Sequence, residues 1–189
     1  ENNVDIVENF EVSNINNSNN VYEIIAKDGK RIHANKIVLA TGVYLEKILK
    51  LLNIKIKIKC FPQQLIVTER MPELLKTVIT VAHGKLSLKQ FENGTVLIGG
   101  GWPGIGNIED NYTETKPENL IGNMRLACHA IPNLKNSRVS RVWLGLEAET
   151  DDAMPIIGEL PNLKNAFIIG SIHSGYTSGP YMGKLLSEK

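Results

Sequence analysis

The chain has 189 residues, 42% hydrophobic and 22% charged, and its formal net charge is +1 at pH 7. This composition is typical of a globular protein and excludes a disordered or fibrous chain, and the near-zero charge, without a basic stripe, argues against a nucleic acid partner. The two cysteines, Cys60 and Cys128, lie far apart, and no apolar run approaches the roughly 18 to 20 residues that span a bilayer, so we expect a cytoplasmic protein without a disulfide framework.

The first 42 residues predict strands that lead into a turn. The expected strands are 4–7, 11–15, 21–26 and 31–34. Asp28-Gly29 between two alternating runs is a typical hairpin turn, and the asparagine-rich stretch 14–20 is expected to be a mobile loop. The run 36–40 is apolar on both faces, as in a central strand of a covered sheet, and Thr41-Gly42 ends it.

The middle of the chain predicts two helices among antiparallel strands. Apolar residues at helical spacing predict a short helix over 44–52 and a longer one over 116–131, with Thr115 as its N-cap and Pro132 as its stop. The strands expected around them are 54–59, 64–68, 77–82, 85–90, 95–99 and 139–146. The expected class is therefore α+β (mixed α/β).

A GxGxxG pattern at 99–104 follows a strand and suggests a nicotinamide-binding domain as one alternative, which predicts NADH binding without flavin. We disfavour it because Pro103 and the polar stretch 107–115 delay any helix until about residue 116. The four histidines are not at metal-ligand spacing, so no metal site is expected.

The end of the chain holds the most informative motif. A short apolar strand, 166–169, runs into a glycine-rich turn, 170–180, and then into an apolar helix. Glycines allow a backbone to approach a bound ring closely, and the start of a helix favours an anionic ligand group. The motif predicts a cofactor-facing turn, with an ordinary strand-turn-helix connection as the alternative.

Four segments in this order resemble the C-terminal half of the FAD-dependent amine oxidoreductases, the family of D-amino-acid oxidase, glycine oxidase and sarcosine oxidase. They are 37–42, 141–146, 152–158 and 170–180. The ending Gly175-Tyr176-Thr177-Ser178-Gly179-Pro180 is most similar to the branch of opine oxidase and the cyanide-forming glycine dehydrogenase.

The resemblance implies FAD as the cofactor and two kinds of domain. Residues 1–42 and 151–189 would belong to the FAD-binding domain, and residues 43–150 would form an antiparallel substrate domain with the helix 116–131. The implied cofactor-binding residues are Val12, Ala40, Thr41, Gly42, Gly170, Ser171, His173, Gly175, Tyr176 and Thr177. The resemblance assigns no catalytic residue, and the implied candidates for the substrate pocket are Gln64, Arg141, Trp143 and His173. For Gln64 and Trp143, core packing is an equal alternative.

Three positions depart from the glycine oxidase pattern. Glu147 stands where an arginine would hold a substrate carboxylate, Pro62 replaces the arginine of an Arg-Gly-Gln segment, and His173 replaces a second arginine in the closing turn. Arg141 or His173 would therefore have to bind any substrate anion.

The resemblance implies an enzyme that oxidises the carbon–nitrogen bond of an amino acid or secondary amine by hydride transfer to FAD. The chain starts at Glu1 and lacks the strand-GxGxxG-helix that holds the FAD pyrophosphate, so we expect a fragment that is inactive alone and needs that N-terminal segment. We expect a hetero- or homo-oligomer. The alternative function is a non-catalytic module that binds a ligand or a partner chain.

Overall fold

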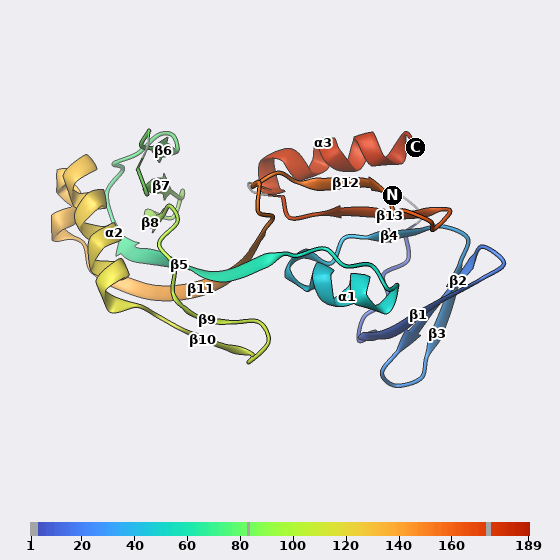
Figure 1. The fold of residues 1–189 in the computed structure, drawn as a ribbon. Coiled ribbons are helices and arrows are strands. Elements are labelled where there is room, and N and C mark those ends of the chain that lie inside the picture. The colour runs from blue at the N-terminus through green and yellow to red at the C-terminus, as the bar shows by residue number, and fades with distance from the viewer. Residues whose placement is uncertain (1–3, 83, 173–174) are drawn as a thin grey trace. The chain divides into compact units, whose positions relative to one another are not determined.

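The computed structural model describes residues 4–82, 84–172 and 175–189. It contains helices and both parallel and antiparallel strand pairs, which confirms the expected mixed α+β class (Figure 1). The chain divides into two units: unit 1 comprises residues 1–59 and 148–189, and unit 2 comprises residues 60–147. The sequence predicts domain borders at 42/43 and 150/151, whereas the two units meet at 59/60 and 147/148. The function of each domain stays a prediction.

Unit 1 begins with an antiparallel sheet of β1 (Val12–Ser18), β2 (Val21–Ala26) and β3 (Arg31–Ala34) in that order. Tight turns set its register. Asn19 and Asn20 both have positive φ, which suits a two-residue hairpin loop, and Gly29 has φ +86° after Asp28. Tyr22 is fully buried, and its hydroxyl donates to the carbonyl of Lys164 at 2.8 Å.

The second sheet of unit 1 joins segments far apart in the sequence. Its order is β12 (Ile156–Glu159), β13 (Ala166–Gly170) and β4 (Ile37–Leu39). β13 is antiparallel to β12 and parallel to β4, with Ile168 opposite Leu39. Because parallel strands point the same way, the carboxyl ends of β4 and β13 lie at one edge of this sheet.

Each of these parallel strands leads into helical structure. After β4 come a 3-10 turn, η1 (Gly42–Tyr44), and the helix α1 (Leu45–Leu51), whose Leu45 and Leu49 are fully buried in the core of unit 1. The helix α3 (Gly175–Ser187) follows β13 and packs along β12 and β13 (Figure 1).

Unit 2 is built on a five-stranded sheet in the order β11-β5-β8-β7-β6. The strands are β5 (Lys59–Arg70), β6 (Ile79–Thr80), β7 (Ser87–Gln90), β8 (Thr95–Gly99) and β11 (Val139–Glu149). The helix α2 (Pro117–Ala130) and the 3-10 turn η2 (Pro132–Asn136) share a core with this sheet. A hairpin of β9 (Ile105–Asn107) and β10 (Tyr112–Glu114) precedes α2.

Several expected elements differ in the structure. Residues 4–7 form no strand and are exposed, Ile6 at 84%, because no strand among the described residues pairs with them. The expected strand 54–59 is irregular up to Ile58: the isoleucines pack on the core of unit 1, and the amide of Ile58 donates to Glu46 Oε2 at 3.1 Å instead of to a strand.

Three further expectations are corrected. The asparagine-rich stretch is strand up to Ser18, because it pairs with β2. Among the described residues β4 pairs only with β13, so it is an edge strand with Val38 53% exposed and not the expected covered central strand. Lys116, not Thr115, is the N-cap of α2, and no side chain caps that helix. In the described parts of the chain, no helix is long and apolar enough to cross a membrane.

Candidate functional site

The candidate site is the edge where β4 and β13 end. Ala40, Thr41 and Gly42 follow β4, whereas Gly170 ends β13 and Ser171 follows it. Continuing the parallel register beyond Ile168 and Leu39 brings these two short segments side by side. Ligands of α/β sheets bind outside the carboxyl ends of parallel strands, and the sequence predicted all five residues as cofactor-binding.

The backbone leaves open space beside Gly42, after β4, but is closely packed at Gly170, the end of β13. Gly42 has φ +55°, and a Cβ atom built there would meet no atom within 4 Å, so the space beside it is open. A Cβ atom on Gly170 would lie 2.4 Å from Leu45 Cδ2. α1 therefore packs directly on the end of β13.

Within the described residues, two hydroxyls at this edge are buried without a hydrogen-bond partner, Thr41 Oγ1 and Ser171 Oγ. Ser171 is only 4% exposed and has φ +49°, a left-handed conformation that is uncommon for a residue with a side chain. Buried polar atoms in native proteins nearly always have a partner, so such exceptions need an explanation.

A hollow of about 490 Å³ opens beside Thr41, a size typical of small-molecule sites. It is lined by Glu11, Val12, Thr41, Tyr44, Lys47 and Ile48. The structure thus brings together Val12 and Thr41, which the sequence predicted as cofactor-binding from distant positions. Lys27 donates to the Glu11 carboxylate at 2.6 Å and holds the pKa of that carboxyl below its usual value.

The closing turn is described only in part. His173 lies outside the described residues, so its predicted contacts with cofactor or substrate are not tested. Gly175 is the first residue of α3, and Tyr176 and Thr177 in the first turn are exposed, Tyr176 completely. Their cofactor contacts remain predictions.

Gln64, predicted to line the substrate pocket, is 1% exposed and fully hydrogen-bonded inside unit 2. Its Nε2 donates to the carbonyls of Pro103 at 3.2 Å and Lys116 at 3.3 Å, and its Oε1 accepts from the amide of Lys116 at 2.6 Å. This side chain ties β5 to the segment before α2. Its placement gives no support to a role in ligand binding.

Arg141 and Trp143, the other pocket candidates, form a cation–π pair with the guanidinium carbon 4.5 Å from the ring centroid. Leu144 and Gln64 both approach Gly104. Leu144 and Gln64 therefore share one face of the sheet. Because side chains alternate along a strand, Arg141 and Trp143 lie on the face opposite to Leu144 and Gln64.

Gln63 lies on the same face as Arg141, and its buried Oε1 has no hydrogen-bond partner in the part of the chain that the structure describes. Sequence reasoning chose Gln64 and missed Gln63. Side chains alternate between the two faces of β5, so the sequence predicts that Gln63 and Gln64 lie on opposite faces. It does not predict which face each residue occupies unless the orientation of one residue of β5 is known.

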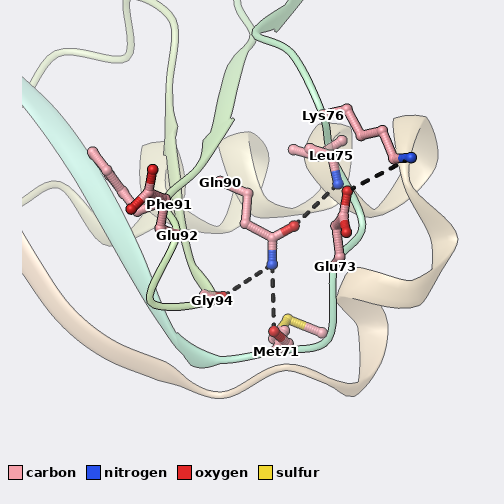
Figure 2. Close-up of a pocket in the computed structure, with 8 residues that line it drawn as sticks. All are labelled: Met71, Glu73, Leu75, Lys76, Gln90, Phe91, Glu92 and Gly94. Carbon is pink, nitrogen blue, oxygen red and sulfur yellow. Dashed lines mark hydrogen bonds and ion pairs between the residues drawn. The ribbon is translucent and has the colours of Figure 1, made fainter.

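A second hollow lies in unit 2, and the amide group of Gln90, which lines it, is already hydrogen-bonded within the protein. Figure 2 shows the amide of Gln90 pointing into the loop that carries Met71, Glu73 and Leu75. Gln90 Oε1 accepts from the amides of Leu74 and Leu75 at 2.7 and 3.0 Å, and Nε2 donates to the carbonyls of Pro72 and Gly94 at 2.9 and 3.1 Å. This arrangement orders a loop.

In the described part of the chain, no group of three or more His, Cys, Asp or Glu side chains could hold an ion. The edge of β4 and β13 instead offers neutral hydroxyls, open space at Gly42 and a ring-sized hollow. These features suit the sugar and base of a dinucleotide, so the residues present fit that part of such a cofactor.

The chain is similar to known proteins along its whole length. The family model described as FAD dependent oxidoreductase matches residues 1–189. The hydrogen cyanide synthase subunit HcnC of Pseudomonas protegens is 26% identical over 100% of this chain and 44% of its own length. The sarcosine oxidase subunit beta of an Arthrobacter species is 25% identical over 95% of the chain and 42% of its own length.

Among solved structures, L-proline dehydrogenase from P. horikoshii superposes with a TM-score of 0.84 at 26% identity. The match covers 96% of this chain and 49% of that one. The chain therefore spans less than half the length of each of these three proteins.

Proposed function

The chain belongs to the family of FAD-dependent oxidoreductases, as its motifs predicted, and from that premise we propose that it takes part in oxidising the carbon–nitrogen bond of an amino acid or a secondary amine. The observation that carries the proposal is the family match along the whole chain. FAD, when bound, supplies the acceptor for a hydride from the carbon beside the amine.

In this proposal, unit 1 holds FAD at the edge of β4 and β13. Thr41 and Ser171 contribute hydroxyls, Gly42 leaves room for the ligand, and Val12 and Tyr44 line the hollow for a ring. The start of α3 adds positive potential from its helix dipole. We place phosphate binding outside these residues, since the sole GxGxxG, at 99–104, leads into β9 and not into a helix.

Unit 2 is proposed as the substrate domain. Arg141 has no carboxylate partner among the described residues and stacks on Trp143, which fixes its guanidinium in place for a substrate carboxylate. Gln63 Oε1, on the same face, is an acceptor for a substrate N–H. His173 remains a predicted further anion-binding residue.

The relatives' names support a further point about partners. HcnC, the sarcosine oxidase beta chain and an opine oxidase chain of Rhizobium meliloti are each named as a subunit. We propose that this chain likewise works together with another polypeptide.

Flavin loading tests the proposal. The chain is purified alone, and also from the complete open reading frame that encodes it, and each preparation is mixed with FAD and desalted. We expect the visible flavin absorbance to survive desalting at least in the second preparation and to bleach without oxygen when an amino acid or secondary amine is added. Arg141→Met should raise the substrate concentration needed for bleaching, while the FAD content stays unchanged.

The alternative is a non-catalytic module that binds a ligand or partner. Colourless protein in both preparations would support this alternative and reject the oxidoreductase.

A further inference from the structure

A hollow of about 520 Å³ lies on the exposed side of α2 in unit 2, apart from the candidate site. It is lined by Ile121, Met124, Arg125, Cys128 and His129 of α2 and by Lys135 of η2, and we call these six residues the α2 groove. α2 and η2 pack against each other (Figure 1). Val142 belongs to the core beneath α2, so α2 covers the face of the sheet opposite to Arg141. A molecule bound in the α2 groove therefore leaves the proposed substrate residues uncovered.

The α2 groove is elongated along its helix. Its α2 residues stand at positions 121, 124, 125, 128 and 129, which is the spacing of one stripe over two helical turns. With a rise of about 1.5 Å per residue, this stripe is about 12 Å long. A track of this shape suits a segment of polypeptide chain, and the spacing is that of anchor positions where helices dock.

The floor of the α2 groove is apolar and only partly covered. Met124 and Cys128 are half-buried and also contact the core of unit 2, whereas Ile121 is 53% exposed. Single exposed apolar residues are common on protein surfaces, but these three lie along one stripe of a hollow. Methionine adapts its shape to a partner and is frequent at binding surfaces. The floor can therefore bury an apolar side chain of a partner.

The rim of the α2 groove is cationic. Arg125 and Lys135 are both exposed, and neither forms an ion pair within the described residues. None of the six groove residues is an aspartate or a glutamate. Arginine binds a carboxylate through two parallel hydrogen bonds, and the ring of His129 can donate a further one. The rim therefore selects a partner that carries carboxylates.

A second copy of this chain does not complement the α2 groove. In a twofold-symmetric dimer one surface patch meets the same patch of the other copy. Arg125 and Lys135 would then face their own equivalents, and like charges at an interface destabilise it. The charges favour a different polypeptide.

We propose that the α2 groove is the docking site for an acidic amphipathic segment of a partner polypeptide. The segment places an apolar side chain against Ile121 and Met124 and carboxylates beside Arg125 and Lys135. This inference deepens the proposed function and rests on it for the existence of a second subunit. It adds the surface that the partner uses and the chemistry that the partner must have.

The test uses the full chain and synthetic peptides of 14 residues, the length of α2. The acidic peptide carries leucine at i, i+3 and i+7 and glutamate on both sides of this stripe. Two sibling peptides carry glutamine or lysine in place of glutamate. Fluorescence anisotropy measures binding. Alkylation of Cys128 by N-ethylmaleimide in a Cys60→Ser background shows whether the peptide occupies the α2 groove, because these are the two cysteines of the chain.

Two variants separate the charges from the apolar contact. Arg125→Glu combined with Lys135→Glu reverses the charge of the rim, and Ile121→Gln removes the apolar side chain from the floor. All three residues are exposed, so the variants should unfold at the temperature of wild type.

Each variant has a matched control. Lys164→Glu combined with Lys184→Glu changes the net charge by the same amount, on exposed residues of unit 1. Val78 is 53% exposed, as Ile121 is, but does not line the groove, so Val78→Gln matches Ile121→Gln.

We expect wild type and both controls to bind the acidic peptide about tenfold more tightly than the glutamine peptide, with no binding of the lysine peptide. The bound acidic peptide should slow the alkylation of Cys128. Charge reversal should abolish this preference and create binding of the lysine peptide, a gain that an unfolded variant could not show. Ile121→Gln should weaken binding of the acidic peptide about three- to tenfold.

Several results overturn the inference. Equal binding of the three peptides, or binding without protection of Cys128, shows that the α2 groove does not select an acidic segment. A wild-type dimer that dissociates in Ile121→Gln assigns the groove to a second copy. Sedimentation with vesicles of equal parts phosphatidylcholine and phosphatidylserine, if charge reversal abolishes it, assigns the groove to a membrane.

Flavin loading of the same preparations separates this inference from the proposed function. Protein that retains FAD but binds no acidic peptide refutes the docking site and leaves the oxidoreductase standing. Protein that binds the acidic peptide with the expected dependence on Arg125 and Lys135, but never retains FAD, supports the docking site and rejects the oxidoreductase.

Discussion

Gly170, the last residue of β13, lies directly against Leu45, the first residue of α1, so closely that a Cβ atom on the glycine would be 2.4 Å from Leu45 Cδ2. Leu45 is fully buried and cannot swing into solvent to make room. This contact holds the start of α1 against the strand edge where Thr41 and Ser171 lie. The position of the candidate site therefore depends on the absence of a side chain at residue 170.

Gly170→Ala should destabilise unit 1 by about 1 to 3 kcal/mol, the usual cost of overpacking a filled core. Chemical denaturation measures the loss. Gly183→Ala is the matched control: Gly183 is an exposed residue of α3 with no atom within 4 Å of a built Cβ, so alanine should stabilise by about 0.5 to 1 kcal/mol through helix propensity. Equal stability of the two variants would contradict the packing argument.

Gln90 orders the loop from Met71 to Leu75 through the amide contacts shown in Figure 2. Gln90→Leu should lower the free energy of unfolding by about 2 to 4 kcal/mol, because backbone groups lose their partners. Hydrogen exchange at the amides of Leu74 and Leu75 should accelerate first.

The control for this loop is Lys76→Ala. Lys76 and Glu73 form an exposed ion pair at 4.0 Å, and such pairs contribute about 0 to 1 kcal/mol. Unchanged exchange at Leu74 and Leu75 in Gln90→Leu would show that the glutamine does not order the loop.

Much of the fold follows from local sequence signals. The Asp28-Gly29 turn, the strands on either side of it and the helix that begins near Tyr44 all form as expected. α2 agrees within one residue at each end with the expected 116–131. These elements have their determinants nearby in the chain, in turn chemistry and apolar periodicity, and that is why they could be predicted.

The remaining features depend on distant neighbours. The isoleucines at alternate positions before Lys59 have the pattern of a strand. They pack instead in the core of unit 1 with α1, and the amide of Ile58 donates to the Glu46 carboxylate and not to a neighbouring strand. Whether Gln63 or Gln64 is free to meet a ligand depends on the orientation of β5, which no local pattern reveals. The sequence suggested Thr41 and Ser171 only through family resemblance; their missing hydrogen-bond partners are visible only in three dimensions.

Gln63 and Gln64 provide a test of neighbouring residues with opposite roles. Gln64→Leu should cost about 1 to 3 kcal/mol of stability, because the partly buried amide and carbonyl of Lys116 lose a hydrogen-bond partner. Gln63→Leu should leave stability unchanged within about 0.5 kcal/mol and weaken substrate binding. Denaturant unfolding and substrate-induced bleaching of the flavin measure the two effects, and a reversal of the pattern would assign the pocket role back to Gln64.

Gly122 of α2 receives the indole of Trp102: a Cβ atom there would be 2.5 Å from Cζ3 of the ring. Gly122→Ala should displace the indole and break the hydrogen bond that Trp102 Nε1 donates to the carbonyl of Lys85. We expect a red-shifted tryptophan emission and a loss of about 1 to 3 kcal/mol. Gly145→Ala has open space around its Cβ and should change neither quantity, so a shift of equal size in both variants would exclude the contact as its cause.

Glu46, in the first turn of α1, should make stability depend on acid pH. Lys50 Nζ donates to its Oε1 at 2.8 Å and the amide of Ile58 donates to its Oε2, and these two hydrogen bonds lower the pKa of the carboxyl below its usual 4.5. A carboxyl with a lowered pKa in the folded state binds protons less readily than in the unfolded chain. Its contribution is therefore complete above pH 4.5 and disappears as the pH falls through the lower, folded value.

Glu46→Gln should accordingly be less stable than wild type at neutral pH, and the two should converge in acid. Lys50→Met should keep part of the pH dependence, because the amide of Ile58 still donates to the carboxylate. Denaturant unfolding of the three proteins from neutral pH to well below 4.5 measures this. A stability difference between wild type and Glu46→Gln that stays constant over that range would mean that the charge of Glu46 does not contribute, since only an ionised carboxylate gains from both donors.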